Sequence, residues 1–301
     1  MITSASLLRL FSCSSDKTIM SSILYITFPW KCGAILLIER KGEDLMKYIV
    51  EIATKRNTKF FDKPNEDCVL VDVDNGIFII LDGVTRDRED GHYPDPSPSF
   101  EVSKLFLKKA HKSLISFPFN ENESIEKAFS EGNREIKKFN RSYSGSFLPG
   151  TVGIIAILRN NKLFYGYIGD CIGMVVNENC KKKFTTCQTK LIHQHSKEFT
   201  AYQIRHIICN NIYHPYSYGV LDGRESALDF VITGKMNIDK YKKILLFTDG
   251  LEEIVKQMSI KELISLEAVD ILNSKLGNKS TDDKTVIVVE LDNNENNDAN
   301  S

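Results

Sequence analysis

The sequence predicts an α+β fold in which two groups of strands enclose a helical region. Short apolar runs that are typical of β-strands dominate residues 48–81 and 150–180, and two more occur farther along the chain. Two longer stretches with apolar residues at helical spacing lie between these groups. Strands that are grouped, instead of alternating one by one with helices, favour α+β over a βαβ architecture.

Three strands are expected in the first group. The runs YIVEIAT (48–54), CVLVDV (68–73) and GIFIIL (76–81) follow one another closely. Asn75-Gly76 lies where the last two runs meet, and this dipeptide is a strong hairpin signal.

Two helices are expected next, at residues 100–117 and 124–139, because both stretches carry an apolar stripe at helical spacing. Ser99 is a suitable N-cap for the first helix, and Asn122 or Glu123 for the second. The second group of strands then covers residues 150–180. Tight turns are expected within it at Asn160-Asn161 and at Gly169-Asp170.

The last third of the domain contains two further strands and two helices. KILLFTDG (243–250) is an apolar strand that ends in Asp-Gly, and LEEIVKQM begins a helix directly after it. A second helix is expected at about residues 261–276. DDKTVIVVEL (282–291) is the final strand, and two acidic residues precede its apolar part.

Composition and charge are those of an ordinary globular protein. Of 301 residues, 42% are hydrophobic and 26% are charged. Lys plus Arg number 39 and Asp plus Glu number 40, so no surplus of positive charge indicates a nucleic-acid partner. Seven scattered cysteines with no C-x-x-C pair indicate no disulfide framework, so we expect a reducing, cytoplasmic location.

We predict that residues 46–292 form the folded domain and that the polar, Asn-rich residues 293–301 form a disordered tail. The status of residues 1–45 stays open. Residues 21–38 are largely apolar, but Pro29 and Lys31 interrupt them and they are short for a membrane span. A membrane anchor through this stretch, a secretory signal, and translation starting at Met46 are the alternatives.

Acidic residues stand at the ends of four apolar strands. They are Glu66 and Asp67 before CVLV, Asp82 after FIIL, Asp249 after ILLF, and Asp282 and Asp283 before TVIVV. A single acid in such a place is ordinary, but antiparallel neighbours can bring several to one edge of a sheet. Clustered carboxylates repel one another unless a cation neutralises them, and oxygen ligands suit Mg²⁺ or Mn²⁺.

The order of short motifs resembles the metal-dependent protein phosphatases, the type 2C-like serine/threonine phosphatases. NED, LDG, GT, GD, TDG and DDKT follow in this order between about residues 48 and 291, so the resemblance covers most of the chain. It implies a four-layer sandwich of two antiparallel β-sheets flanked by helices, with a two-metal centre at one end. Gly150-Thr151 is similar to the GT that begins a core strand in that family.

The resemblance also implies a set of metal-binding residues. They are Asp67 beside Glu66, Asp82, Gly83, Asp249 and Asp282, together with Asp170, which in several family members joins a third, weaker site. Asp82 matches the aspartate that bridges both metals, Gly83 matches a backbone-carbonyl ligand, and Asp82 and Asp249 are the expected catalytic acids. Asp283 takes a place usually held by Asn or Asp. The implied cofactors are two Mn²⁺ or Mg²⁺ ions, or three if the third site is filled.

The implied activity is hydrolysis of phosphoserine and phosphothreonine in a phosphorylated protein, in signal transduction. Two cations can activate a bridging water for attack on phosphorus, so no protein nucleophile is needed. We expect a monomer. The alternative is a catalytically inactive type 2C-like module that binds or regulates a partner.

The sequence departs from the family pattern beside the first Asp-Gly. Family members often carry a histidine there, but Val84 stands in its place, and Arg86 or His92 is a candidate replacement. The loop at residues 87–99 contains three prolines and is either a lid or a surface linker.

A second departure concerns the phosphate-binding arginine that many bacterial members place five residues before the aspartate of the Glu-Asp pair. That position is Asp62 in this chain, with Lys59 and Lys63 nearby. The residue that binds phosphate is therefore open.

One further cluster invites interpretation as a zinc site. It consists of Cys187, His193, His195, His206, Cys209 and His214. Its spacings match no common zinc pattern. In the family a variable flap is inserted here, so polar surface residues are the expected interpretation.

Overall fold

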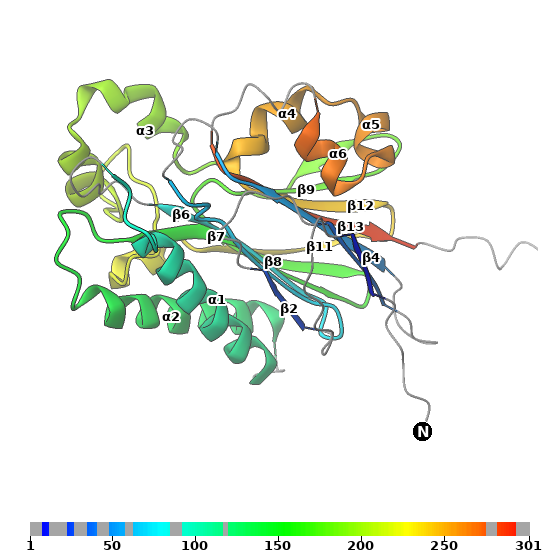
Figure 1. Cartoon of the computed structure of the whole chain (residues 1–301), viewed down its shortest axis with the longest axis horizontal. Coiled ribbons are helices and arrows are strands. Elements are labelled where there is room, and N and C mark those ends of the chain that lie inside the picture. The colour runs from blue at the N-terminus through cyan, green and yellow to red at the C-terminus, as the bar shows by residue number, and fades with distance from the viewer. Residues whose placement is uncertain are drawn as a thin grey trace, which may run out of the picture.

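The computed structural model describes residues 8–11, 23–26, 35–40, 48–57, 63–84, 92–116, 120–274 and 282–292. Two antiparallel sheets pack face to face, and helices cover the outer face of each sheet (Figure 1). The predicted four-layer α+β sandwich is therefore confirmed.

The first sheet has seven strands in the described residues. Their order is β1 (Leu8–Phe11), β3 (Ile35–Arg40), β4 (Tyr48–Lys55), β13 (Lys284–Leu291), β12 (Lys243–Phe247), β9 (Ile172–Val176) and β10 (Lys181–Lys183). The second sheet has six described strands. Their order is β11 (Ile232–Asn237), β8 (Lys162–Ile168), β7 (Gly150–Arg159), β6 (Ile77–Val84), β5 (Cys68–Asp72) and β2 (Ile23–Ile26).

Three apolar cores hold these layers together. One lies between the two sheets and includes Val50, Phe78 and Leu246. A second lies between the second sheet and the helices α1 (Pro98–Ser116) and α2 (Glu121–Asn140). The third packs the first sheet against α4 (Glu252–Gln257), α5 (Ile260–Ser265) and α6 (Ala268–Asn273).

The two turns with the strongest sequence signals form as expected. Gly76 closes the turn between β5 and β6 with a φ of 59°, which glycine adopts at little cost. Asn160 and Asn161 take φ values of 49° and 56° in the turn between β7 and β8. Asparagine tolerates this left-handed conformation better than most residues.

Two features near the acidic residues differ from the sequence prediction. Strand β6 does not stop before Asp82 but continues to Val84, because Asp82 and Gly83 still pair with β7. The turn at Gly169-Asp170 does not close a hairpin, since β8 and β9 belong to different sheets. The chain crosses from one sheet to the other at this point.

The helices also differ in detail from the prediction. Helix α1 begins at Pro98, so Ser99 lies inside its first turn and is not its cap. Helix α2 is capped by Asn120, whose side chain accepts a hydrogen bond from the Asn122 amide. The single helix expected after residue 261 is two short helices, because a new capping box at Glu267 starts α6.

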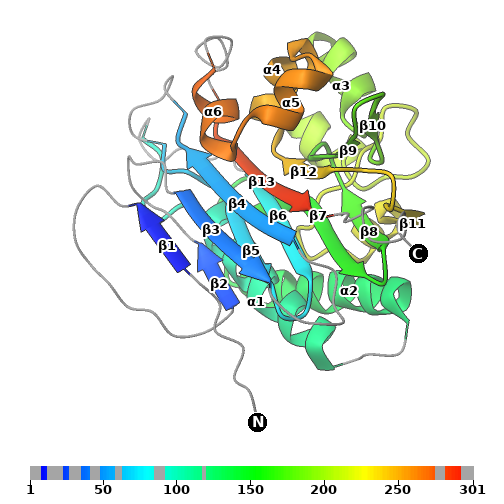
Figure 2. The same ribbon diagram turned by 90° about the vertical axis from the view of Figure 1, so that its right-hand side faces the viewer.

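Strands β1, β2 and β3 lie within residues 1–45, and they extend the edges of both sheets (Figure 2). The division at residues 45 and 46 stays a prediction, and residues 293–301 lie outside the described residues. Among the described residues, no helix has the length and apolar character needed to cross a membrane.

A buried polar pair ties the second sheet to its helical layer. Asp72 at the end of β5 is fully buried, and its Oδ2 lies 2.8 Å from Nε2 of the buried His111 on α1. The Asn75 amide and side chain also donate to this carboxylate, at 3.0 and 2.9 Å. Burial alone would raise the pKa of Asp72, but these hydrogen bonds lower it below its ordinary value.

Replacing Asp72 by alanine is expected to lower the free energy of unfolding by about 3 kcal/mol, because His111 loses its buried partner. Since the pKa of Asp72 is lower in the folded state, its contribution is present above the unfolded pKa and disappears as pH falls through the folded pKa. Urea unfolding should therefore show a difference that is large at neutral pH and shrinks below about pH 4.

The matched control is Asp74→Ala in the same turn, where the side chain is exposed. It should change the free energy of unfolding by less than about 0.5 kcal/mol. An equal loss in the two variants would contradict the role of the Asp72–His111 pair.

Candidate metal centre

Four acidic residues from separate parts of the chain line one cleft of about 490 Å³ at the edge of the sandwich. They are Asp82 on β6, Asp170 at the crossing between the sheets, Asp249 after β12 and Asp282 before β13. Antiparallel pairing explains their convergence, because Phe247 at the end of β12 lies opposite Val286 near the start of β13 and Ile172 at the start of β9.

Burial and the charges of neighbouring acids raise the pKa values of Asp82 and Asp249. Burial, followed by the charges of Asp67 and Asp249, raises the pKa of Asp82 well above its ordinary value. Burial, followed by the charges of Asp170 and Asp282, raises the pKa of Asp249 to about 8. Carboxyl groups that are held this close are costly to ionise together, so the cleft favours a positive charge.

The donor chemistry of the cleft fits hard divalent cations. Oδ1 of Asp67 and Oδ1 of Asp249 are buried, and neither has a hydrogen-bond partner in the described structure. Carboxylate oxygens of this kind are the ligands that Mg²⁺ and Mn²⁺ prefer. Within the part of the chain that is described, however, no three acidic, histidine or cysteine side chains are already grouped to hold one ion.

Asp67 lies behind the cleft and is not part of its lining. It is buried, and its Oδ2 accepts hydrogen bonds from the hydroxyl groups of Thr285 at 2.6 Å and Thr248 at 3.1 Å. Its charge still reaches Asp82, where it is the largest contribution after burial. The sequence prediction that Asp67 is one of the metal ligands stays a prediction.

Gly83 lines the cleft beside Asp82. A Cβ atom at this position would lie 2.8 Å from Cβ of Glu66 and 3.0 Å from its carbonyl oxygen. Close packing of β6 against the Glu66 backbone therefore requires glycine. The hydroxyl of Thr151 on β7 fixes the neighbouring backbone by donating to the Asp82 carbonyl oxygen at 2.8 Å.

Lys63 is the cation at the edge of this cleft. Its Nζ lies 3.1 Å from Oε2 of Glu66, 3.4 Å from Oδ2 of Asp283 and 3.7 Å from Oδ1 of Asp282. Burial opposes its charge, but these carboxylates raise the pKa of Lys63 above its ordinary value. Its ammonium group therefore stays charged and compensates the acids on one side of the cluster.

The two acids that precede β13 have different surroundings. Asp283 is buried, and its carboxylate accepts hydrogen bonds from the amides of Asn57 at 2.6 Å and Glu66 at 3.2 Å. It therefore joins the end of β4 to the segment before β5. The Asp282 side chain is 57% exposed and faces the cleft, so it is the acid of the pair that is accessible to a ligand.

Apolar residues form the opposite rim of the cleft. Val84, Tyr93, Phe147 and Ala201 belong to this lining. Val84 stands out in the sequence because it follows Asp82-Gly83, whereas the other three come from segments with no local signal of function. His92 is exposed and does not line the cleft, and Arg86 lies outside the described residues.

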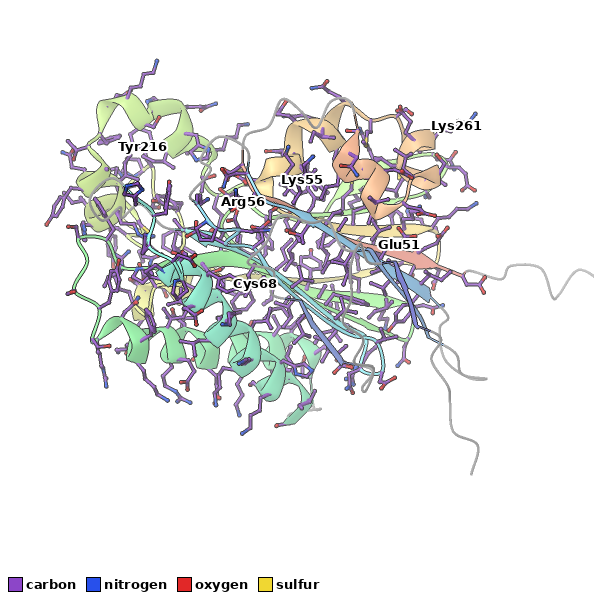
Figure 3. All side chains as sticks on the ribbon, in the orientation of Figure 1. Glu51, Lys55, Arg56, Cys68, Tyr216 and Lys261 are labelled. Carbon is purple, nitrogen blue, oxygen red and sulfur yellow. The ribbon has the colours of Figure 1, made fainter. Side chains whose placement is uncertain are left out.

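The flap, residues 184–231, lies at the end of the molecule that carries the cleft, and Tyr216 marks it in Figure 3. Its histidines are spread over separate contacts. His195 stacks on Tyr216. His206 stacks on Phe147, and its ring also contacts the ring of Tyr202. Among the described residues, no three of these histidines and cysteines are grouped to hold one ion, so the zinc interpretation has no support.

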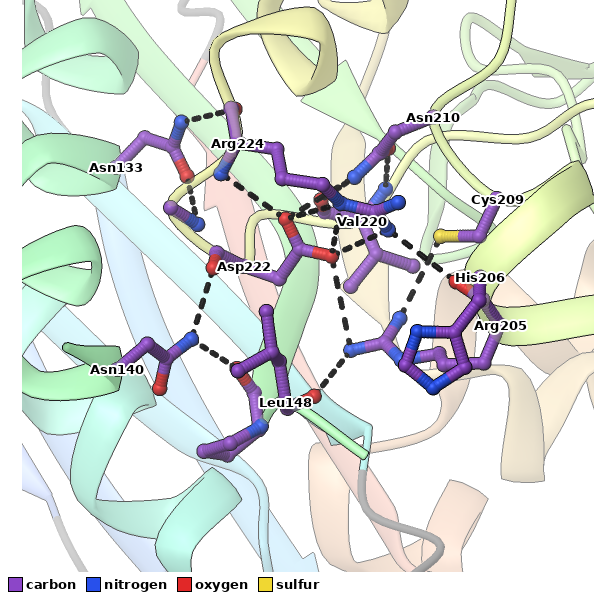
Figure 4. Close-up of polar contacts among 12 residues, drawn as sticks. Asn133, Asn140, Leu148, Arg205, His206, Cys209, Asn210, Val220, Asp222 and Arg224 are labelled. Carbon is purple, nitrogen blue, oxygen red and sulfur yellow. Dashed lines mark hydrogen bonds and ion pairs between the residues drawn. The ribbon is translucent and has the colours of Figure 1, made fainter. Parts of the chain in front are cut away.

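Buried Asp222 anchors the flap to α2, as Figure 4 shows. Its carboxylate pairs with Arg224 at 2.6 Å and accepts a hydrogen bond from Asn210 at 3.2 Å, and its carbonyl oxygen accepts one from Asn140 at 2.8 Å. Arg205 extends the network by donating to the Leu148 carbonyl oxygen at 2.7 Å. The flap therefore has a fixed place beside the cleft.

Lys63→Met is expected to lower the free energy of unfolding by about 3 kcal/mol, because the buried carboxylate of Glu66 loses its cation. The control is Lys104→Met, which removes a partly exposed pair with Glu101 on α1 and should cost less than about 1 kcal/mol. Chemical denaturation measures both variants. Equal losses would argue against Lys63 as the compensating charge.

Several solved structures of bacterial serine/threonine phosphatases share this fold. The phosphatase PstP/Ppp of Mycobacterium tuberculosis matches with a TM-score of 0.61 and 18% identity, over 82% of this chain and 99% of that chain. PppA, a regulatory component of the T6SS in Pseudomonas aeruginosa, also matches, with a TM-score of 0.57 and 15% identity, over 81% of this chain and 97% of that chain. Stp1 of Staphylococcus aureus gives 0.56 and 16%, over 80% and 94%.

No protein-family model matches the sequence, and no curated protein matches it. At the identities just given, the likeness to the solved structures establishes the fold. The resemblance that the sequence motifs indicated is thus confirmed in three dimensions. The chain has the fold of the PPM-type serine/threonine phosphatases.

Proposed function

We propose that this protein is a metal-dependent phosphatase that hydrolyses phosphoserine and phosphothreonine in proteins. The observation that carries the proposal is the cleft in which Asp82, Asp170, Asp249 and Asp282 converge, and where burial and like charge raise the pKa values of Asp82 and Asp249. The shared fold with PPM-type phosphatases supports it, and one structure of PstP is a complex with two manganese ions.

In this proposal, the ligands of two Mn²⁺ or Mg²⁺ ions would be Asp67, Asp82, Asp249 and Asp282, with Gly83 as a backbone ligand and Asp170 available to a third ion. The unpartnered Oδ1 of Asp67 supports its place in this set. When bound, the ions would supply an activated water and neutralise charge on the phosphoryl group.

The residues around the acids have separate tasks in this proposal. Lys63 keeps Asp282 and Glu66 in place through its ammonium group. The rim of Val84, Tyr93 and Phe147 contacts the substrate beside the phosphoryl group and excludes water from one side of the cleft.

The proposal also covers the substrate, the oligomeric state and the cellular compartment of this protein. The substrate is a phosphorylated protein, and the expected state is a monomer. The five cysteines described as free support a reducing, cytoplasmic compartment. A membrane association through residues 21–38 is the alternative that the apolar character of this stretch keeps open.

A catalytically inactive binding module is the second candidate. Val84 favours it, because an apolar side chain stands where many relatives carry a histidine that can act as a general acid. The retained acidic set favours the enzyme. Metal binding and turnover therefore separate the two candidates.

Asp82→Asn and Asp249→Asn should each lower kcat/KM for p-nitrophenyl phosphate by at least about 100-fold, since even indirect partners of a metal often matter this much. Asp239→Asn, an exposed acid beyond β11, is the control and should keep full activity. Wild-type turnover in either cleft variant would remove the basis for the proposed catalytic acids.

Mn²⁺ titration by calorimetry should show binding to the wild-type protein that is strongly weakened in Asp82→Asn. Asp82 lies among the other acids of the cleft, so its loss removes the central carboxylate. EDTA should abolish p-nitrophenyl phosphate hydrolysis, and added Mn²⁺ should restore it. A wild-type protein that binds no Mn²⁺ would instead favour the inactive binding module.

A further inference from the structure

A second cavity, here called the flap pocket, lies beneath the flap and has a volume of about 100 Å³. Val84 on β6 and Val152 on β7 belong to its lining from the sheet. Ile192, Ile204 and Val220 belong to its lining from the flap. The pocket therefore exists only because the flap is docked on the ends of these strands.

The flap pocket directly adjoins the cleft that the acids line. Val84, Val152 and Asp170 line both cavities. A ligand whose phosphoryl group occupies the cleft can therefore place a neighbouring group in the pocket. Consecutive Cα atoms are about 3.8 Å apart, so an adjacent residue of a peptide has the necessary reach.

The lining of the pocket selects an apolar group. Ile192, Ile204 and Val220 are 3%, 6% and 1% exposed, so their side chains already form a dry wall. Asp170 is the acid in the lining, and the Thr189 hydroxyl donates to its Oδ2 at 2.9 Å. A negatively charged side chain would lose its water here and would meet the like charge of Asp170 instead of a matching partner.

The size of the pocket restricts the occupant further. An apolar cavity of about 150 Å³ can hold benzene, so a smaller one suits a branched aliphatic side chain better than an indole. Val84 contributes to the apolar character of the flap pocket, because a histidine at its position would place a polar ring in the wall.

The pocket is formed before any ligand arrives. The Asn210 side chain donates to the Val220 carbonyl oxygen at 2.8 Å and accepts from the Val220 amide at 2.8 Å. The Asn210 amide also donates to the Tyr218 carbonyl oxygen at 2.8 Å. Because this wall is held in place, a ligand does not bear the full cost of ordering it.

We propose that the flap pocket is a specificity subsite for a branched aliphatic side chain within two positions of the phosphorylated residue. This inference rests on the proposed function and narrows its substrate class to phosphoproteins with Leu, Ile or Val beside the phosphorylation site. Leucine at that position should strengthen binding about ten-fold or more over aspartate.

Binding of phosphonate peptides, which mimic phosphoserine peptides and cannot be hydrolysed, tests the proposal. Each peptide carries Leu, Asp or Trp at one position from −2 to +2, and fluorescence anisotropy gives its Kd in the presence of Mn²⁺. At one position, Leu should bind at least about ten-fold more tightly than Asp or Trp. Equal affinities at every position would overturn the proposal.

Two variants on the same short helix, α3 (Lys190–His195), locate the preference. His193→Trp blocks the pocket from an exposed position in its lining and should abolish the preference for Leu. Leu191→Trp changes a residue that is 49% exposed and outside the lining, and it should keep the preference. A preference that survives in His193→Trp would overturn the proposal.

Ser196→Trp is a second variant that blocks the pocket from an exposed lining position. It keeps the test decisive if His193→Trp does not fold. Thermal melting checks both tryptophan variants. Turnover of p-nitrophenyl phosphate by the wild-type protein is measured separately, since this small substrate has no neighbouring residue. If the wild-type protein does not hydrolyse this substrate, the proposed phosphatase function fails. The peptide affinities test the subsite independently of that result.

Discussion

Repulsion among carboxylates at one edge of the sandwich is the constraint on which the candidate site depends. Asp82, Asp170, Asp249 and Asp282 line a single cleft, and each raises the cost of ionising its neighbours. Apolar strands hold them there, because their backbones are fixed by the cores on both faces of the sheets. The folded chain therefore maintains a concentration of negative charge that favours a bound cation.

The chain compensates this charge unevenly. On one side, Lys63 pairs with Glu66, Asp283 and Asp282, and backbone amides satisfy Asp283. On the other side, Asp249 retains a buried oxygen without a partner in the described structure. Lys63, Asp249 and Asp282 all line the cleft, so the compensated and the uncompensated acids border the same space.

The flap adds the second functional element. Its attachment depends on Asp222, which is buried and bonded to Arg224 and to Asn140 on α2. This attachment brings apolar flap residues over the ends of β6 and β7. Val84, which departs from the pattern of related phosphatases, becomes part of the wall between the cleft and the flap pocket. The departure is consistent with a role in substrate choice.

The sequence by itself determined most of the strands after residue 46, though not β11, and two of the hairpin turns. Apolar runs and turn residues such as Asn75-Gly76 act locally, so their structural effect can be predicted from neighbours in the chain. The motif order was enough to predict the sandwich. It also predicted that Asp82, Asp249 and Asp282 come together, and all three line the cleft, although Asp82 lies within β6 and not at its end.

Only the tertiary structure decided which sheet each strand joins and what surrounds each acid. The crossing at Gly169-Asp170 looks like a hairpin in sequence, because a turn signal does not say which strand will be the partner. Tyr93 and Phe147 reach the cleft from distant loops, and Lys63 meets Asp282 and Asp283 across more than 200 residues of chain. Such contacts depend on packing between layers, which no local pattern specifies.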